Sequence, residues 1–257
     1  MNLPGFTPQL TLPAANIEHE ETPHFWHQCL RAYTWQPIYK TNGRLMAMEL
    51  LTIVTHPDNP ARHLAPERYF SAVSVCHRVL VIKEQLRLLA THSPFFKRHD
   101  ILASVNIDGP TLLALHDCRE TQSQIAALSW LRFELVEHMT LPQNATFAEI
   151  CHGLPLWLDD FGTGMANFSA LSAVRYDHIK MARELFSMLR QIQEGRLLFN
   201  LLLELINRYC RGVIVEGIEK LDEWREVQAS PACAAQGYFL ARPVPSEKLE
   251  NILINLV

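Results

Sequence analysis

Short apolar runs alternate along the chain with longer segments in which apolar residues recur every three or four positions. The first pattern predicts strands and the second predicts helices. The expected strands are 44–54, 102–107, 131–136, 156–158, 178–181, 213–215 and 237–240. The expected helices are 24–31, 66–89, 111–115, 146–152, 168–174, 184–189, 196–209, 221–227 and 247–256.

The order of these elements predicts the fold class. Repeated strand-then-helix order predicts an α/β protein with a mainly parallel sheet. Roughly eight such units in 257 residues favour a TIM-like (β/α)8 barrel, with a doubly wound open sheet as the alternative. Residues 1–20 contain three prolines and little periodicity, so we expect an irregular N-terminal arm followed by one domain over 21–257.

Composition and charge narrow the class of protein. Hydrophobic residues make up 48% of the chain, yet no apolar run is long enough to span a membrane and the N-terminus does not resemble a secretion leader. The six cysteines are scattered, which favours free thiols in a reducing compartment and hence a cytoplasmic protein. A net charge of −4 argues against a nucleic-acid polymer as partner and leaves an anionic small molecule open.

Acidic and amide side chains fall where the expected strands end. They are Glu49, Asn106, Glu134, Asp159, Asp160, Glu216 and Gln236. The carboxyl ends of all strands in a (β/α)8 barrel meet on one face, so these groups should meet there too. Carboxylates brought together have raised pKa values unless cations neutralise them. Ligands that are all oxygen select a hard ion such as Mg²⁺ or Mn²⁺, and two adjacent carboxylates suit two ions that clamp a phosphoryl displacement.

Two further features accompany this acidic set. Lys180 is a charged residue inside an apolar strand pattern, where its ammonium would orient the attacking water or neutralise charge on a phosphate. Gly162 and Gly164 allow a tight backbone just after the acidic pair, and Glu137, which would face away from Glu134, is expected to hold that loop. Taken singly, each residue fits a turn, a cap or an exposed position. Their order at consecutive strand ends favours a site.

The chain resembles the EAL family of cyclic di-GMP phosphodiesterases over nearly its whole length, and most closely the stand-alone enteric members of that family. The matching residues are Gln36, Glu49, Asn106, Glu134 to Glu137, Asp159 to Gly164, Lys180, Glu216 to Glu219 and Gln236 to Tyr238. The resemblance implies a modified TIM barrel with one antiparallel strand and hydrolysis of cyclic di-GMP to linear pGpG. It also implies a possible homodimer and a cellular role in favouring motility over adhesion.

The same resemblance assigns roles to residues. The implied metal ligands, for one or two Mg²⁺ or Mn²⁺ ions with Ca²⁺ inhibitory, are Glu49, Asn106, Glu134, Asp159 and Asp160. The implied catalytic residues are Glu49, Asp159, Lys180 and Glu216. Of these, Lys180 orients water and Glu216 assists at the metal or acts as the base. The implied substrate contacts are Gln36, Leu50, Asp160 and Gln236, and the implied loop-stabilising residues are Glu137 and Glu219.

The chain departs from the family pattern at three positions. Leu50 replaces the signature alanine, Ile53 replaces an arginine that contacts phosphate in much of the family, and Ala182 replaces an aspartate. Loss of an arginine–phosphate contact should weaken substrate binding by about 1.5–3 kcal/mol without removing a metal ligand. An active hydrolase is the favoured interpretation. The alternative is a binding module, either a cyclic di-GMP receptor or a protein that captures another protein.

Overall fold

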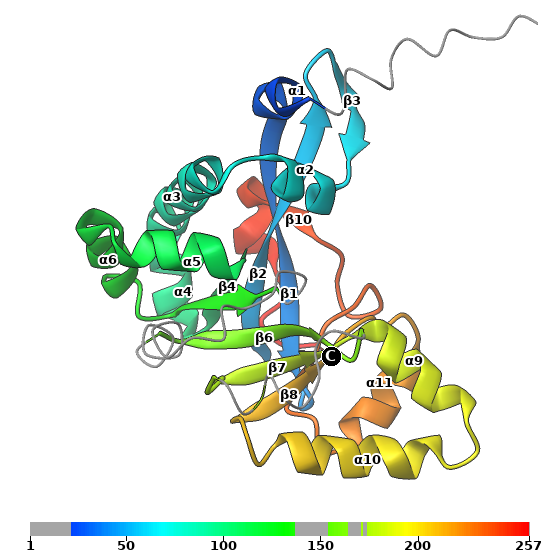
Figure 1. The fold of residues 1–257 in the computed structure, drawn as a ribbon. Helices are drawn as coiled ribbons and strands as arrows, with labels where there is room; N and C mark the ends of the chain where they lie inside the picture. Colours follow the sequence, from blue (N-terminus) through cyan, green and yellow to red (C-terminus); the bar gives the residue numbers. More distant parts are fainter. Residues whose placement is uncertain (1–21, 137–153, 164–170, 172–173, 257) are drawn as a thin grey trace, which may run out of the picture. The chain divides into compact units, whose positions relative to one another are not determined.

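The computed structural model of the chain describes residues 22–136, 154–163, 171 and 174–256 (Figure 1). The chain forms two compact units. The first comprises Met1–Arg31 and Ile53–Ser74, and the second comprises Ala32–Thr52 and Val75–Val257. The arm expected at 1–20, the helix expected at 146–152 and most of the helix expected at 168–174 lie outside the described residues.

The smaller unit combines short helices with the end of a β-hairpin. Its described elements are α1 (Pro23–Gln28), the last residues of β2 (Leu45–His56), β3 (Asn59–Leu64) and α2 (Pro66–Ala72). Strand β3 pairs antiparallel with β2. Helix α1 begins where the Thr22 side chain accepts a hydrogen bond from the Phe25 amide at 3.3 Å. Buried Tyr69 accepts a hydrogen bond from Arg31 at 3.0 Å and lies edge-on to Trp26, so this unit has an aromatic centre of its own.

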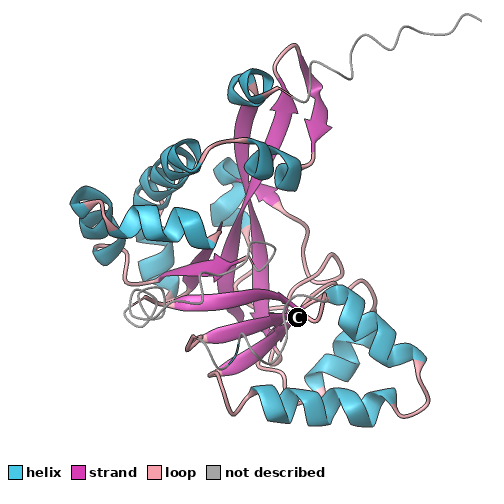
Figure 2. Cartoon of the chain, viewed as in Figure 1, coloured by secondary structure: helices cyan, strands magenta, loops and turns pink. Residues whose placement is uncertain are grey.

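The larger unit is built around a closed β-barrel (Figure 2). Its strands follow the order β1-β9-β8-β7-β6-β5-β4-β2, and β2 pairs with β1 to close the ring. The remaining bounds are β1 (Leu30–Lys40), β4 (Leu102–Ile107), β5 (Leu131–Leu135), β6 (Leu156–Phe161), β7 (His178–Met181), β8 (Gly212–Val215) and β9 (Ala234–Ala235). Neighbours from β2 round to β9 run parallel, whereas β1 runs antiparallel to β9. The expected TIM-like barrel with one antiparallel strand is confirmed.

Helices occupy most connections between the parallel strands, as the alternating sequence pattern predicts (Figure 1). They are α3 (Val75–Thr91), α4 (Ser93–His99), α5 (Gly109–His116), α6 (Arg119–Ala126), α9 (Arg183–Gln191), α10 (Gly195–Ile206) and α11 (Leu221–Gln228). The helix expected at 66–89 is broken at residues 73–74 into α2 and α3. A short 3-10 helix, η3 (Ser246–Asn251), replaces the helix expected at 247–256, and the two-residue strand β10 (Val244–Pro245) precedes it.

A small apolar cluster separate from the main core supports the strand ends. Its buried residues are Ile38, Met46, Ala47, Trp157, Ile214 and Ala234. Residues two positions apart on a strand point to the same side. Ala47, Trp157, Ile214 and Ala234 each stand two positions before a polar residue that the sequence analysis places at a strand end. These polar residues therefore lie next to an apolar floor that keeps water away from one side of them.

The prediction of a strand at 237–240 is wrong. Strand β9 ends at Ala235, and the amides of Leu240 and Ala241 then donate hydrogen bonds to the carbonyl of Gly237 at 3.0 Å, which forms a turn. Gly237 lies so close to Ile218 that an added Cβ would overlap the Ile218 backbone. The apolar run at 237–240 thus turns at a close backbone contact instead of extending the barrel.

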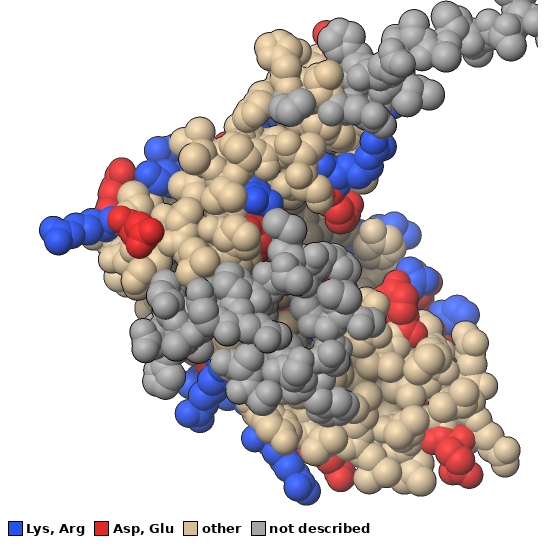
Figure 3. All heavy atoms as spheres, viewed as in Figure 1, with Lys and Arg blue, Asp and Glu red and all other residues tan. Residues whose placement is uncertain are grey.

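Helix length, surface charge and the state of the cysteines bear on the expectations drawn from composition. None of the helices in the described ranges has both the length and the apolar character needed to cross a membrane. On the face drawn in Figure 3, acidic and basic side chains of the described residues are interspersed. The five cysteines within the described residues are free thiols, as the sequence analysis expects.

His178, the first residue of β7, is expected to make the stability of the fold depend on pH. Burial lowers the pKa of His178 from 6.5 to about 4, because the charged ring would lose its hydration. A folded-state pKa below the unfolded one means that protons favour the unfolded chain. The contribution of the neutral His178 ring to the free energy of unfolding is complete above pH 6.5 and is lost as the pH falls toward 4. The loss should be about 3 kcal/mol.

Urea unfolding of the wild type and of His178→Gln across this pH range measures the effect. Glutamine cannot titrate, so the variant should lose less stability on acidification than the wild type does. Parallel pH profiles for the two proteins would contradict the assignment.

Candidate active site

The carboxyl ends of the parallel strands bring the expected polar residues together beside the apolar floor. We name the set the acidic centre; its members are Glu49 on β2, Asn106 on β4, Glu134 on β5, Asp159 and Asp160 on β6, Lys180 on β7, Glu216 after β8 and Gln236 after β9. Parallel strands end on the same rim, which is why side chains 187 positions apart in sequence form a hydrogen bond here.

Lys180 occupies the middle of the acidic centre. Its Nζ lies 2.7 Å from Glu134 Oε2, 2.8 Å from Glu216 Oε1 and 3.1 Å from both Glu49 Oε2 and Asp159 Oδ1. Lys180 is 1% exposed and Glu134 is 0% exposed. Charges buried this deeply persist only when they are paired. One ammonium therefore holds four carboxylates that come from four different strand ends.

Two amides fix the orientation of Glu49. Asn106 Nδ2 donates to Glu49 Oε1 at 2.8 Å, and Gln236 Nε2 donates to Glu49 Oε2 at 2.7 Å. Within the described part of the chain, the amide oxygens of Asn106 and Gln236 and the Oε1 atom of Glu134 are buried and accept no hydrogen bond. Buried oxygens rarely stay without a partner, so these three atoms indicate a bound ligand that interacts with oxygen lone pairs, such as a cation.

A distortion of β6 turns two consecutive aspartates toward the same place. Successive side chains of a regular strand point to opposite faces, so Asp159 and Asp160 could not both face the centre in an ideal strand. Asp160 adopts a left-handed φ of +54°, and the pairing of β6 with β7 changes register just here. Aspartate tolerates this region better than most residues. Carboxylate oxygens of Asp159, Asp160 and Glu216 consequently lie within 4.8 Å of one another.

The pKa values show that one lysine does not neutralise the centre. Burial raises the pKa of Glu134 well above its usual value, and Glu49 adds to this. Burial likewise raises the pKa of Glu216 to about 8, against the opposing effect of Lys180. Burial would also raise the pKa of Glu49, but Lys180 and the two amides hold it below the usual value. The pKa of Lys180 itself lies well above normal, because Asp159, Glu134, Glu216 and Glu49 overcome its burial.

These observations fit a hard divalent cation. Four carboxylates around one ammonium leave up to three negative charges unbalanced. Without a cation, this charge is reduced only when Glu134 or Glu216 takes up a proton, which their raised pKa values favour. The donors that face the centre are oxygen atoms, apart from the Lys180 ammonium and the two amide NH₂ groups. Carboxylate and amide oxygens are the ligands that such a cation takes. The cluster of Asp159, Asp160 and Glu216 has the spacing of a metal site.

Other expected site residues lie elsewhere or outside the described residues. Gln36 is half-buried on β1, and in the described chain no hydrogen bond or ion pair links it to the acidic centre. Leu50 is 1% exposed and belongs to the main hydrophobic core, so its side chain faces away from Glu49. Gly162 has a φ of +105°, as the expected tight backbone requires, whereas Glu137 and Gly164 lie outside the described residues.

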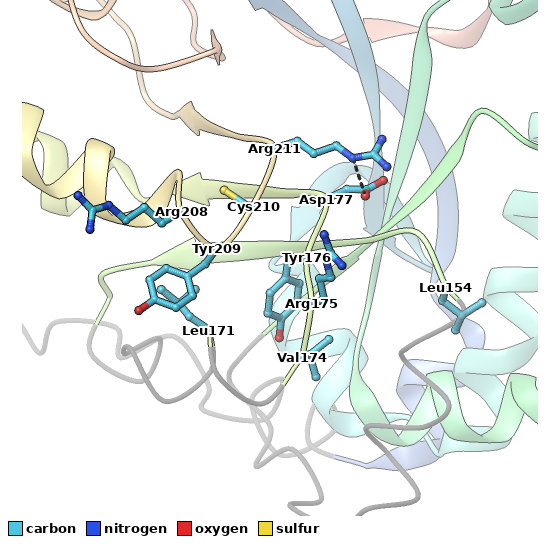
Figure 4. A pocket seen from close by; sticks show the side chains of 10 residues that line it. All are labelled: Leu154, Leu171, Val174, Arg175, Tyr176, Asp177, Arg208, Tyr209, Cys210 and Arg211. Atoms are coloured by element: carbon cyan, nitrogen blue, oxygen red, sulfur yellow. Dashed lines mark ion pairs between the residues drawn. The ribbon is translucent and has the colours of Figure 1, made fainter.

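The cavity drawn in Figure 4 is not part of the acidic centre. Its volume is about 690 Å³, and its walls include the residues that precede β7, such as Tyr176 and Asp177, and those that precede β8, such as Tyr209 and Arg211. It therefore lies at the amino-terminal ends of these strands, whereas Lys180 and Glu216 lie toward their carboxyl ends. Asp177 is already paired with Arg211 at 3.4 Å and with Arg132 at 3.2 Å. We assign this cavity no part in the chemistry.

The sequence analysis missed Arg183, which stands at the rim beside the acidic centre. It is the first residue of α9, and its Nη1 lies 2.9 Å from Glu219 Oε1. Its aliphatic atoms run over Gly217, where an added Cβ would overlap them. The signal in the sequence is a cation three positions after Lys180 and two positions past the end of a strand. Glu219, expected to stabilise a loop, is thus the ion-pair partner of this arginine.

Comparisons with known proteins agree with this geometry. The family model described as the EAL domain matches residues 20–243. The chain is 62% identical over 248 residues to the cyclic di-GMP phosphodiesterase PdeH of Escherichia coli (strain K12), covering 96% of this chain and 97% of that protein. It is 24% identical over 221 residues to the anti-FlhC(2)FlhD(4) factor YdiV of Salmonella typhimurium (strain LT2), covering 84% of this chain and 92% of that protein.

Solved structures show the same fold at low identity. The EAL-like domain protein YdiV has a TM-score of 0.79 at 16% identity, covering 90% of this chain and 100% of that one. The c-di-GMP complex of the phosphodiesterase PaMucR has a TM-score of 0.67 at 19% identity, covering 85% of this chain and 94% of that one. At these identities the likeness supports the barrel and not the chemistry.

Lys180→Met tests whether the ammonium holds the centre together. Methionine fills similar space without charge and leaves the buried carboxylates uncompensated, so in EDTA the variant should lose about 3–5 kcal/mol of unfolding free energy in urea. Lys83→Met is the matched control, because the ion pair of Lys83 with the exposed Glu120 is long, at 3.7 Å, and its loss should cost less than about 1 kcal/mol. Equal stabilities for Lys180→Met and the wild type would contradict the role of Lys180.

Proposed function

The chain belongs to the EAL-domain family, and from this premise we propose that it is a metal-dependent phosphodiesterase that hydrolyses cyclic di-GMP to linear pGpG. The observation that carries the proposal is the complete acidic centre, with oxygen donors from β2, β4, β5 and β6 gathered around Lys180. The identity of 62% to a cyclic di-GMP phosphodiesterase, over nearly the full length of both chains, supports it.

The residues of the centre divide into those that hold a cation and those that handle water. Glu49, Asn106, Glu134, Asp159 and Asp160 would hold the ion, which supplies a Lewis acid for a phosphate oxygen and a lowered pKa for a bound water. Lys180 holds the attacking water in place and balances the charge that grows on the phosphate. Glu216 Oε1 lies 2.8 Å from the same ammonium, where it can accept the proton of that water. Gln236 and Asn106 keep Glu49 in position.

Magnesium or manganese is the ion that this donor set favours. Both are hard cations that bind carboxylate and amide oxygens, and the centre offers neither a cysteine nor a histidine ligand among the described residues. The adjacent Asp159 and Asp160 would allow a second ion. Calcium shares the preference for oxygen but takes more ligands at longer distances, so we propose that it binds without supporting the reaction.

A binding module is the second candidate. The departures Leu50, Ile53 and Ala182 favour it, as does the similarity to YdiV, which is described as an anti-FlhC(2)FlhD(4) factor. Against it stands the acidic centre, in which no proposed metal ligand has been replaced by a residue unable to bind a cation. The hydrolase is therefore the function that the site supports better.

The cellular setting completes the proposal. An enzyme that removes this second messenger would act in the cytoplasm and favour motility over adhesion. The free cysteines of the described residues suit a reducing compartment. The homodimer, the contact of Gln36 and Leu50 with substrate, the loop role of Glu137 and the single domain over 21–257 stay predictions.

The direct test is incubation of the purified protein with cyclic di-GMP and Mg²⁺ or Mn²⁺, followed by chromatography for pGpG. Glu49→Ala removes a metal ligand that also accepts from two amides, so turnover should fall by at least about 100-fold. Glu120→Ala, an exposed glutamate on α6, is the control and should keep full activity. Absence of pGpG from the wild type at every metal concentration would refute the hydrolase.

Metal binding itself is measured by thermal unfolding. A ligand that binds only the folded state at a hundred times its dissociation constant stabilises it by about 2.7 kcal/mol, which corresponds to roughly 5–11 °C at this size. Mn²⁺ and Ca²⁺ should both raise Tm, and Glu134→Gln should reduce the rise by removing a carboxylate. A Tm that no divalent ion changes would contradict the metal site.

A further inference from the structure

Binding of cyclic di-GMP at the acidic centre requires positive charge that the centre does not itself present to a ligand. The substrate carries two phosphodiester charges, and one Lys180 faces four carboxylates. That ammonium is 1% exposed and already surrounded by acids. Position 53, where the sequence resemblance implies an arginine, is the uncharged Ile53. A bound cation offsets part of the charge, but a second, exposed donor at the rim is needed to hold a phosphate outside the metal site.

Arg183 is built into that rim. Its Cβ, Cγ and Cδ cross directly over Gly217, the residue next to Glu216. Gly217 has a φ of +71°, and a Cβ there would overlap all three of these atoms. The glycine thus leaves room for the arginine to run from the start of α9 across the end of β8. The guanidinium then pairs with Glu219, three residues past Glu216 of the acidic centre.

The guanidinium has donors to spare. The Arg183 side chain is 54% exposed, and its partner Glu219 is 41% exposed. The contact of Nη1 with Glu219 at 2.9 Å is the only ion pair of Arg183 within the described ranges, so Nε and Nη2 remain for a ligand. An exposed pair of this kind contributes little stability, because water screens both charges. A phosphate can therefore displace Glu219 at small cost.

Resting on the proposed function, we propose that Arg183 is a substrate-binding residue that holds a phosphate of cyclic di-GMP at the rim of the acidic centre. Two parallel N–H donors of a guanidinium match two phosphate oxygens, and such charge-assisted pairs are the strong ones. In the absence of substrate Glu219 takes the place of the phosphate and keeps the side chain extended over Gly217. The contact supplies at the end of β7 the charge that position 53 lacks.

Equilibrium binding of cyclic di-GMP in Ca²⁺ tests the assignment. Arg183→Gln should weaken binding about tenfold, as expected for loss of one charged hydrogen-bonding partner, and raise KM with little change in kcat. Arg183→Lys keeps the charge and should recover part of the affinity. Arg211→Gln is the matched control, since Arg211 is also exposed and ion-paired but precedes β8 at its other end. It should bind as the wild type does.

Two further measurements separate a phosphate contact from a structural tether or a base contact. If Arg183 only anchors Glu219, then Glu219→Gln should weaken binding as much as Arg183→Gln does. A phosphate contact predicts that Glu219→Gln binds at least as tightly as the wild type. It also predicts that the affinity of Arg183→Gln depends less on salt, because a screened charge pair has been removed. Equal losses in the two variants, or an unchanged salt dependence, would overturn the assignment.

The outcome for Arg183 is independent of the outcome for catalysis. Wild-type protein that binds cyclic di-GMP but makes no pGpG in Mn²⁺ would refute the hydrolase and leave the Arg183 contact standing. Wild-type protein that makes pGpG, with an Arg183→Gln variant of unchanged affinity and KM, would refute the contact alone. Wild-type protein that binds no cyclic di-GMP would refute both.

Discussion

The buried ammonium of Lys180 is the interaction on which the acidic centre depends. Without it, Glu49, Glu134, Asp159 and Glu216 would place four carboxylates in a region nearly closed to water, at a cost of several kcal/mol for each unpaired charge. With it, the group is held in place but remains short of positive charge, as the raised pKa values of Glu134 and Glu216 indicate. A structure that tolerates this imbalance is prepared for a divalent cation.

The barrel makes the imbalance possible. Parallel strands deliver side chains from distant parts of the chain to one rim, and the apolar cluster below them removes water that would otherwise screen their charges. Local backbone departures complete the geometry. The left-handed Asp160 turns a second carboxylate toward Glu216, and the glycine at 217 lets Arg183 cross beside it. Both lie where β6 and β8 end, so the regular strands carry the site and their irregular ends shape it.

Much of the barrel and of the acidic centre could be predicted from the sequence. An apolar run that ends in an acid or amide predicts both a strand and a functional side chain at its carboxyl end. Strands 102–107 and 178–181 agree with β4 and β7 at both ends, and the acidic centre forms from residues named beforehand. Strand β1 was not predicted, since polar and apolar residues mix along it. The turn at Gly237 depends on a contact with Ile218, and Arg183 depends on Gly217; such contacts between distant strand ends leave no local pattern.

Anomalous diffraction from a crystal grown in Mn²⁺ would test the central claim most directly. The account predicts a manganese peak bounded by oxygen atoms of Glu49, Asn106, Glu134 and Asp159, with the Lys180 ammonium nearby. The acceptor atoms of Asn106 and Glu134 that lack partners here should become ligands. A map with no manganese among these residues, and with their side chains turned toward bulk water, would contradict it.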